Sequence, residues 1–113
     1  SDWLAQNEGK SLTLDYWIHN GLGDSHARGG NYEQAVESYE KATATYCKLY
    51  NTSEKEIRKG NFQDQALGKT MYSLGRVYAS LSSVAKAERN CVLGAKCGYG
   101  PAREFCDNFK IKY

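Results

Sequence analysis

The stretch of sequence that decides the fold occurs twice in this chain. Residues 21–42 read GLGDSHARGGNYEQAVESYEKA, and residues 73–94 read SLGRVYASLSSVAKAERNCVLG. Each copy contains a Leu-Gly pair, an Ala 13 residues after the Leu, and a small residue seven positions beyond that Ala. Between the Ala and the small residue lies Tyr39 in one copy and Cys91 in the other. Leu22 and Leu74 therefore mark an internal duplication with an offset of 52 residues, which makes a repeat architecture the first hypothesis.

Hydrophobic spacing predicts a pair of helices around each copy. The first helix begins near Leu12, and its apolar residues share one face: Leu14, Trp17, Ile18 and Leu22. Gly29-Gly30 ends this helix, and Asn31 is a suitable N-cap for the next one. The second helix carries the stripe Tyr32, Ala35, Val36, Tyr39, Ala42, Tyr46 and Leu49. Because the joint is short, the two helices are predicted to run antiparallel as a hairpin.

The rest of the chain predicts a connector, a second hairpin and a last helix. Ser53 followed by Glu54 could open one short helical turn in an otherwise exposed connector. A helix over 63–81 is followed by Ser82-Ser83, which caps a further helix, and Pro101 suits the first turn of the last one. We therefore expect a single all-α domain over 1–113. Its parts are a first hairpin (11–50), a connector (51–62), a second hairpin (63–97) and a C-terminal capping helix (101–113).

The duplicated pattern resembles the tetratricopeptide repeat, with Leu-Gly on the first helix of each hairpin and small residues that let the second helix approach closely. The resemblance implies stacked hairpins, a concave groove lined mainly by the first helices, and a protein-binding role. Three features depart from the family. Met71 replaces the early aromatic residue of the motif in the second copy, and Cys91 stands where a large aromatic residue is usual. The offset of 52 residues also exceeds the family's period of about 34. Two repeats are few for a free-standing array, so disulfides or a homodimer would have to add stability.

The four cysteines in 113 residues favour an oxidising compartment. The spacing Cys91-x5-Cys97-x8-Cys106 does not match the paired C-x2-C units of zinc sites, so we expect no metal. A disulfide from Cys91 or Cys97 to Cys106 would tie the capping helix to the second hairpin, and Cys47 could bridge to Cys97. The alternative is four buried thiols in a cytosolic protein. The expected location is therefore periplasmic or secreted, with a cytoplasmic location as the alternative.

Composition and charge narrow the classes of function. Hydrophobic residues make up 41% of the chain and charged residues 25%, as in a folded domain, and no apolar run is long enough to span a membrane. Residues 1–50 hold seven acidic and four basic side chains, whereas residues 51–113 hold six and eleven, a polarity that could steer an acidic partner. There is no dense basic run of the kind that binds nucleic acid. No Ser/His/Asp grouping is present, so we expect no catalytic residues and no cofactor.

The leading hypothesis is a module that binds another protein. Its contact residues would project from the first helix of each hairpin: Asp15, Tyr16, Asn20, Asp24, Lys69, Tyr72 and Arg76. Tyr and Trp dominate interface energetics, although core packing is the default for Trp17. The alternative within binding proteins is a small periplasmic or secreted inhibitor, such as an immunity protein that blocks a toxin or hydrolase. An enzyme or a metal-binding protein is the third class.

Overall fold

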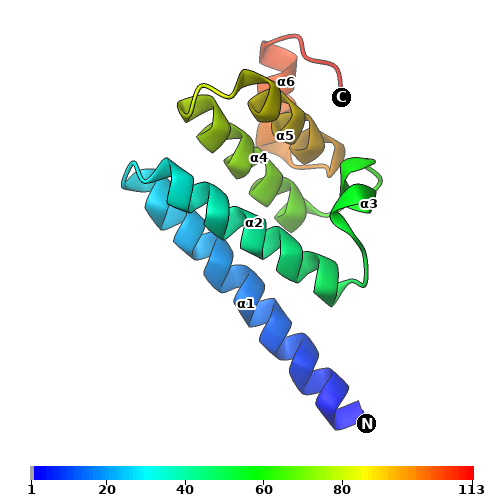
Figure 1. Ribbon diagram of the computed structural model, residues 1–113. Coiled ribbons are helices and arrows are strands. Elements are labelled where there is room, and N and C mark those ends of the chain that lie inside the picture. The colour runs from blue at the N-terminus through cyan, green and yellow to red at the C-terminus, as the bar shows by residue number, and fades with distance from the viewer. Residues whose placement is uncertain (1) are drawn as a thin grey trace.

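The computed structural model describes the backbone of residues 2–113 and the side chains of residues 7–113. Over these residues the chain forms six α-helices and no strand, which confirms the all-α prediction (Figure 1). The helices are α1 (Asp2–Arg28), α2 (Tyr32–Leu49), α3 (Glu54–Arg58), α4 (Gln65–Ser80), α5 (Val84–Lys96) and α6 (Gly100–Asn108).

The helices pack in pairs along an elongated molecule of 49 × 31 × 21 Å. Helix α1 lies along α2, and α4 lies along α5 (Figure 1). The first pair contacts the second mainly through α2 and α4, and α6 covers the far side of the second pair. The N-terminal end of α1 projects beyond the end of α2 (Figure 1).

Equivalent glycines of the two copies allow the close approach within each pair. A Cβ atom at Gly23 of α1 would lie 2.6 Å from the ring of Tyr39 on α2. A Cβ atom at Gly75 of α4 would lie 2.6 Å from the Sγ of Cys91 on α5. Both contacts join positions related by the 52-residue offset. The duplicated sequence thus makes the same helix-to-helix contact twice, with Cys91 in the place of an aromatic ring.

The turns inside the two pairs are also alike. Gly30 has a φ of +78° and Ser82 has a φ of +61°, in the left-handed region that ends many helices. In each turn the next residue donates its N–H to a carbonyl five residues earlier, at 2.8 Å in the first turn and 2.9 Å in the second. Asn31 and Ser83 then occupy the N-cap positions, although neither side chain makes the capping hydrogen bond that was predicted.

The start of α1 and the packing of the connector differ from the sequence-based predictions. Helix α1 begins at Asp2, well before the predicted start near Leu12. The connector is not wholly exposed, because α3 folds back and buries Ile57 to 2% exposure against the core cluster that includes Tyr46 and Met71. The predicted short turn itself is present, with the Ser53 Oγ accepting a hydrogen bond from the amide of Glu56 at 3.3 Å.

The apolar face predicted for the first helix points to solvent. Leu14, Trp17, Ile18 and Leu22 are 62%, 59%, 55% and 46% exposed. The buried side of α1 is formed instead by residues such as Tyr16 and Gly23, which face the other helices. Helical spacing shows that these apolar residues share a face, but it does not show whether another element covers that face.

The four cysteines are free thiols in the structure, so the predicted disulfides are not formed. Cys91, Cys97 and Cys106 are at most 2% exposed, and Cys47 is half-buried. Cys106 packs with Ala95 and Ala102 between α5 and α6. These thiols fill the core as small apolar side chains. Burial in apolar surroundings raises the pKa of Cys91 and of Cys97 to about 11.

Candidate functional site in the groove between α1 and α4

The surface between α1 and α4 is hollowed along its length. One hollow of about 200 Å³ lies between Trp17 on α1 and Lys69 on α4. A second, more open hollow of about 380 Å³ continues from it towards Arg28 and Arg76. Both hollows share Asp24 and Ser73 in their linings. We call the two together the α1/α4 groove. It lies between the first helices of the two helix pairs, where the resemblance to tetratricopeptide repeats implies a binding surface.

A chain of hydrogen bonds forms the floor of the groove and fixes α1 to α4. The hydroxyls of Tyr16 and Thr70 lie 2.8 Å apart. The Thr70 hydroxyl donates to the Oδ1 of Asn20 at 2.6 Å, and the Asn20 amide donates to the Tyr16 carbonyl at 2.9 Å. Tyr16 is 5% exposed and Thr70 is 2% exposed. Burial raises the pKa of Tyr16, so its hydroxyl stays protonated and holds its place in the chain.

Asp24 stands where the two hollows meet, and its carboxylate is held in place from α2. The Tyr39 hydroxyl donates to the Asp24 Oδ1 at 2.5 Å. Burial and this carboxylate both raise the pKa of Tyr39, because each disfavours the phenolate. Asp24 therefore presents a fixed negative charge with acceptor capacity left on its carboxylate.

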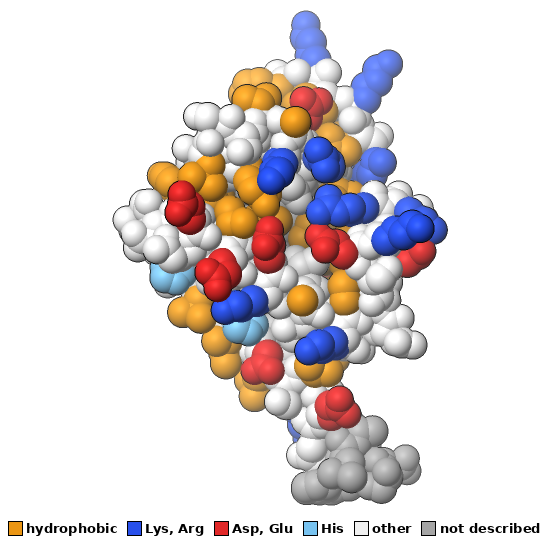
Figure 2. Space-filling model, viewed as in Figure 1, with side chains coloured by type: hydrophobic (Ala, Val, Ile, Leu, Met, Phe, Trp, Pro, Cys, Tyr) orange, Lys and Arg blue, Asp and Glu red, His pale blue; other side chains and the backbone are white. Residues whose placement is uncertain are grey.

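Basic side chains outnumber acidic ones around the groove. Arg28, Lys69 and Arg76 line it together with the single acidic residue Asp24. The Arg76 guanidinium carbon lies 5.9 Å from the centre of the Tyr72 ring, a cation–π distance. On the face drawn in Figure 2, Lys and Arg side chains gather mainly towards the end formed by the C-terminal helices. The groove thus combines a net positive charge with an exposed indole at its rim.

The structure brings together most of the predicted contact residues but changes their roles. Asn20, Asp24, Lys69 and Arg76 line the groove, as does Tyr16. Tyr16 is buried, so it is a structural residue of the floor rather than a surface anchor. The aromatic residue available to a partner is instead Trp17, for which core packing was the sequence-based expectation.

The other two predicted residues lie outside the groove. Asp15 is exposed on α1 and lines neither hollow. Tyr72 is half-buried and packs against two aromatic rings. Its ring centre lies 5.8 Å from that of Tyr99 and 6.0 Å from that of Phe105. Arg28 was missed, although it follows Asp24 by four residues and so shares its helix face.

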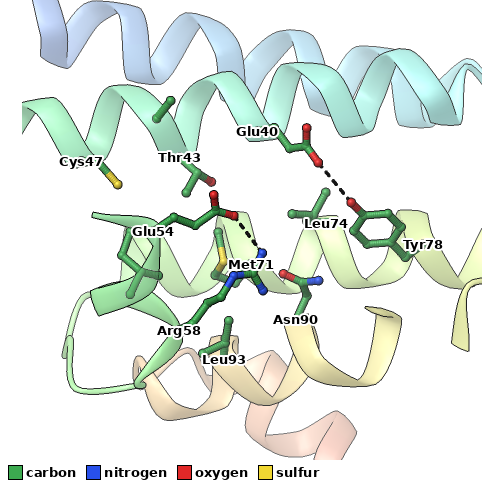
Figure 3. A pocket seen from close by; sticks show the side chains of 12 residues that line it. Glu40, Thr43, Cys47, Glu54, Arg58, Met71, Leu74, Tyr78, Asn90 and Leu93 are labelled. Atoms are coloured by element: carbon green, nitrogen blue, oxygen red, sulfur yellow. Dashed lines mark hydrogen bonds and ion pairs between the residues drawn. The ribbon is translucent and has the colours of Figure 1, made fainter. Parts of the chain in front are cut away.

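Apart from the α1/α4 groove, a cavity of about 200 Å³ lies among α2, α3, α4 and α5 (Figure 3). The sequence did not predict this cavity. Its apolar lining includes Met71, Leu74 and Leu93, and the ion pair between Glu54 and Arg58, at 2.8 Å, stands at its α3 side. Local spacing could not reveal it, because four separate helices supply its walls.

No further class of site emerges from the part of the chain that the structure describes. Within it, no group of three or more His, Cys, Asp or Glu residues could hold a metal ion. None of the described helices is long and apolar enough to cross a membrane. No protein-family model, no curated protein and no solved structure matches this chain.

Proposed function

We propose that this protein is a tetratricopeptide-like helical-repeat module that binds an acidic segment of a partner protein in the α1/α4 groove. The observation that carries the proposal is the groove itself. The exposed Trp17 lies at the rim of the groove. The charged residues that line the groove are three bases, Arg28, Lys69 and Arg76, and one acid, Asp24.

The chemistry of the groove favours an extended, acidic peptide. Lys and Arg side chains attract carboxylates, and Arg76 can form two parallel hydrogen bonds to one of them. Trp17 offers a large, rigid apolar surface on which a hydrophobic side chain of the partner can pack. The hydrogen-bonded floor gives a surface that does not have to be ordered on binding, which lowers the entropic cost.

Two structural features that recur at an offset of 52 residues support the assignment as a repeat protein. They are the close glycine contacts within each helix pair and the turns that join the helices of each pair. The hypothesis of an exported protein depended on disulfides, and it is therefore not part of this proposal.

The test is a selection from a random peptide library displayed on phage, with the full chain as bait. We expect the enriched peptides to contain Asp or Glu beside an apolar residue. The double variant Trp17→Ala/Arg76→Glu should bind them at least about tenfold more weakly.

A matched control removes an exposed aromatic residue and reverses an exposed base outside the groove. Tyr50→Ala/Arg89→Glu changes the same types of residue, and it should leave peptide binding unchanged. The proposal fails if no peptide is enriched, or if enriched peptides bind the groove variant as tightly as the unmodified chain.

A further inference from the structure

We propose that a second copy of this chain docks on the outer face of α1, so that two α1 helices pair antiparallel about Ile18. The docking face is a line of five exposed residues, which we call the α1 stripe: Ser11, Leu14, Ile18, Leu22 and Ser25. This surface is separate from the α1/α4 groove and from the function proposed for it.

The α1 stripe is uncovered in the single chain. At 100° of helical rotation per residue, its five members fall within an arc of about 80°. That arc lies on the opposite side of α1 from Tyr16 and Gly23, which pack towards the other helices. Figure 2 shows hydrophobic side chains along this outer edge of α1. Leu14, Ile18 and Leu22 remain 62%, 55% and 46% exposed, and of the three only Leu14 borders another described helix, where it lines a shallow hollow with Leu49 of α2.

The order of residues in the stripe points to a second copy as the occupant. Leu14 and Leu22 lie four residues on either side of Ile18, and Ser11 and Ser25 lie seven residues on either side. The stripe therefore reads the same in both directions. A two-fold interface requires a self-complementary surface, and a stripe in which like residues face each other meets that requirement.

A two-fold axis through Ile18 matches each residue with its like. Ile18 meets the Ile18 of the second copy, Leu14 meets Leu22, and Ser11 meets Ser25. The large side chains occupy the centre, and small hydroxyl side chains let the helices close at both ends. No member of the stripe carries a charge, so the pairing buries no unpaired ion.

The size of the stripe predicts a dimer that dissociates on dilution. Its three large side chains are about half exposed, so they leave far less apolar surface than the roughly 800 Å² per partner of a standard interface. We therefore expect a weak dimer, in which the one-copy species (12.7 kDa) predominates on dilution and the two-copy fraction rises with concentration.

Sedimentation equilibrium on the full chain over a wide range of concentration tests the association. The mass should rise with concentration towards two copies. The change Ile18→Glu places two carboxylates face to face on the axis and should weaken association at least about 30-fold. The control Val84→Glu alters an equally exposed apolar residue on α5 and should leave the mass unchanged.

Oxidative cross-linking tests the register. Ile18→Cys should give a disulfide-linked dimer, and so should the double variant Leu14→Cys/Leu22→Cys. Leu14→Cys alone should not, because the two Leu14 positions lie about 12 Å apart along the paired helices. The unmodified chain controls for its own cysteines.

A single-copy mass at all concentrations, an association that Ile18→Glu leaves intact, or efficient cross-linking of Leu14→Cys alone would each overturn the proposal.

Discussion

Gly75 provides a sharp test of how the second pair of helices packs. A Cβ atom at this position would lie 2.6 Å from the Cys91 Sγ, 2.9 Å from the Ala87 carbonyl oxygen and 3.0 Å from the Cys91 amide nitrogen. Two of these three atoms belong to the backbone of α5, so the clash is relieved only by moving the helix. Overpacking of this kind lowers the free energy of unfolding by about 3 kcal/mol. The higher helix propensity of alanine offsets about 1 kcal/mol of that loss.

We therefore expect Gly75→Ala to lower the free energy of unfolding by about 2 kcal/mol and the melting temperature by about 10 °C. The matched control is Gly21→Ala, because nothing lies within 4 Å of a Cβ atom at Gly21. The control should gain up to about 1 kcal/mol. Thermal and urea unfolding followed by circular dichroism, at one protein concentration, measure both changes. A Gly75→Ala variant that is as stable as the control would refute the close contact between α4 and α5.

Other predictions follow from turns, caps and buried titratable groups. Ser82→Gly should stabilise the chain by about 0.5–1 kcal/mol in urea unfolding, because Ser82 has a φ of +61°. Asp64→Ala should cost about 3 kcal/mol in the same assay, since Asp64 accepts hydrogen bonds from two amides of α4 and from the Tyr46 hydroxyl. Cys91 and Cys97 should resist alkylation in the native protein and react after unfolding, as counted by mass spectrometry. Their raised pKa values mean that the unfolded chain loses these protons first, so stability should fall as the pH rises above about 9, which urea unfolding at pH 8 to 10.5 would detect.

The features predicted from sequence were those that depend on neighbouring residues. The Leu-Gly pairs and their offset identified two matching segments, and Gly30 ends its helix with the expected positive φ. Pro101 lies in the first turn of α6, as its fixed φ favours. These signals act over a few residues, so a single sequence contains them.

The predictions that failed concern what covers each surface. Tyr16 is buried against α4, where its hydroxyl forms hydrogen bonds with the Thr70 hydroxyl and the Ala66 carbonyl, about 50 residues along the chain. Ile57 is buried because α3 folds back over the helix pairs. Trp17 is exposed because it lies at the rim of the α1/α4 groove, where the described helices leave a hollow rather than close over it. Periodicity identifies a face but not its neighbour, so the sequence could not show that Tyr16 is buried and Trp17 exposed.

The most direct test of the proposed function is a nuclear magnetic resonance titration of the full chain with the tightest peptide from the library selection. We predict chemical-shift changes along the α1/α4 groove, clustered at the Trp17 indole, Asn20, Lys69 and Ser73. Changes confined to the cavity beside α3, or spread over the surface without a centre in the groove, would contradict this prediction.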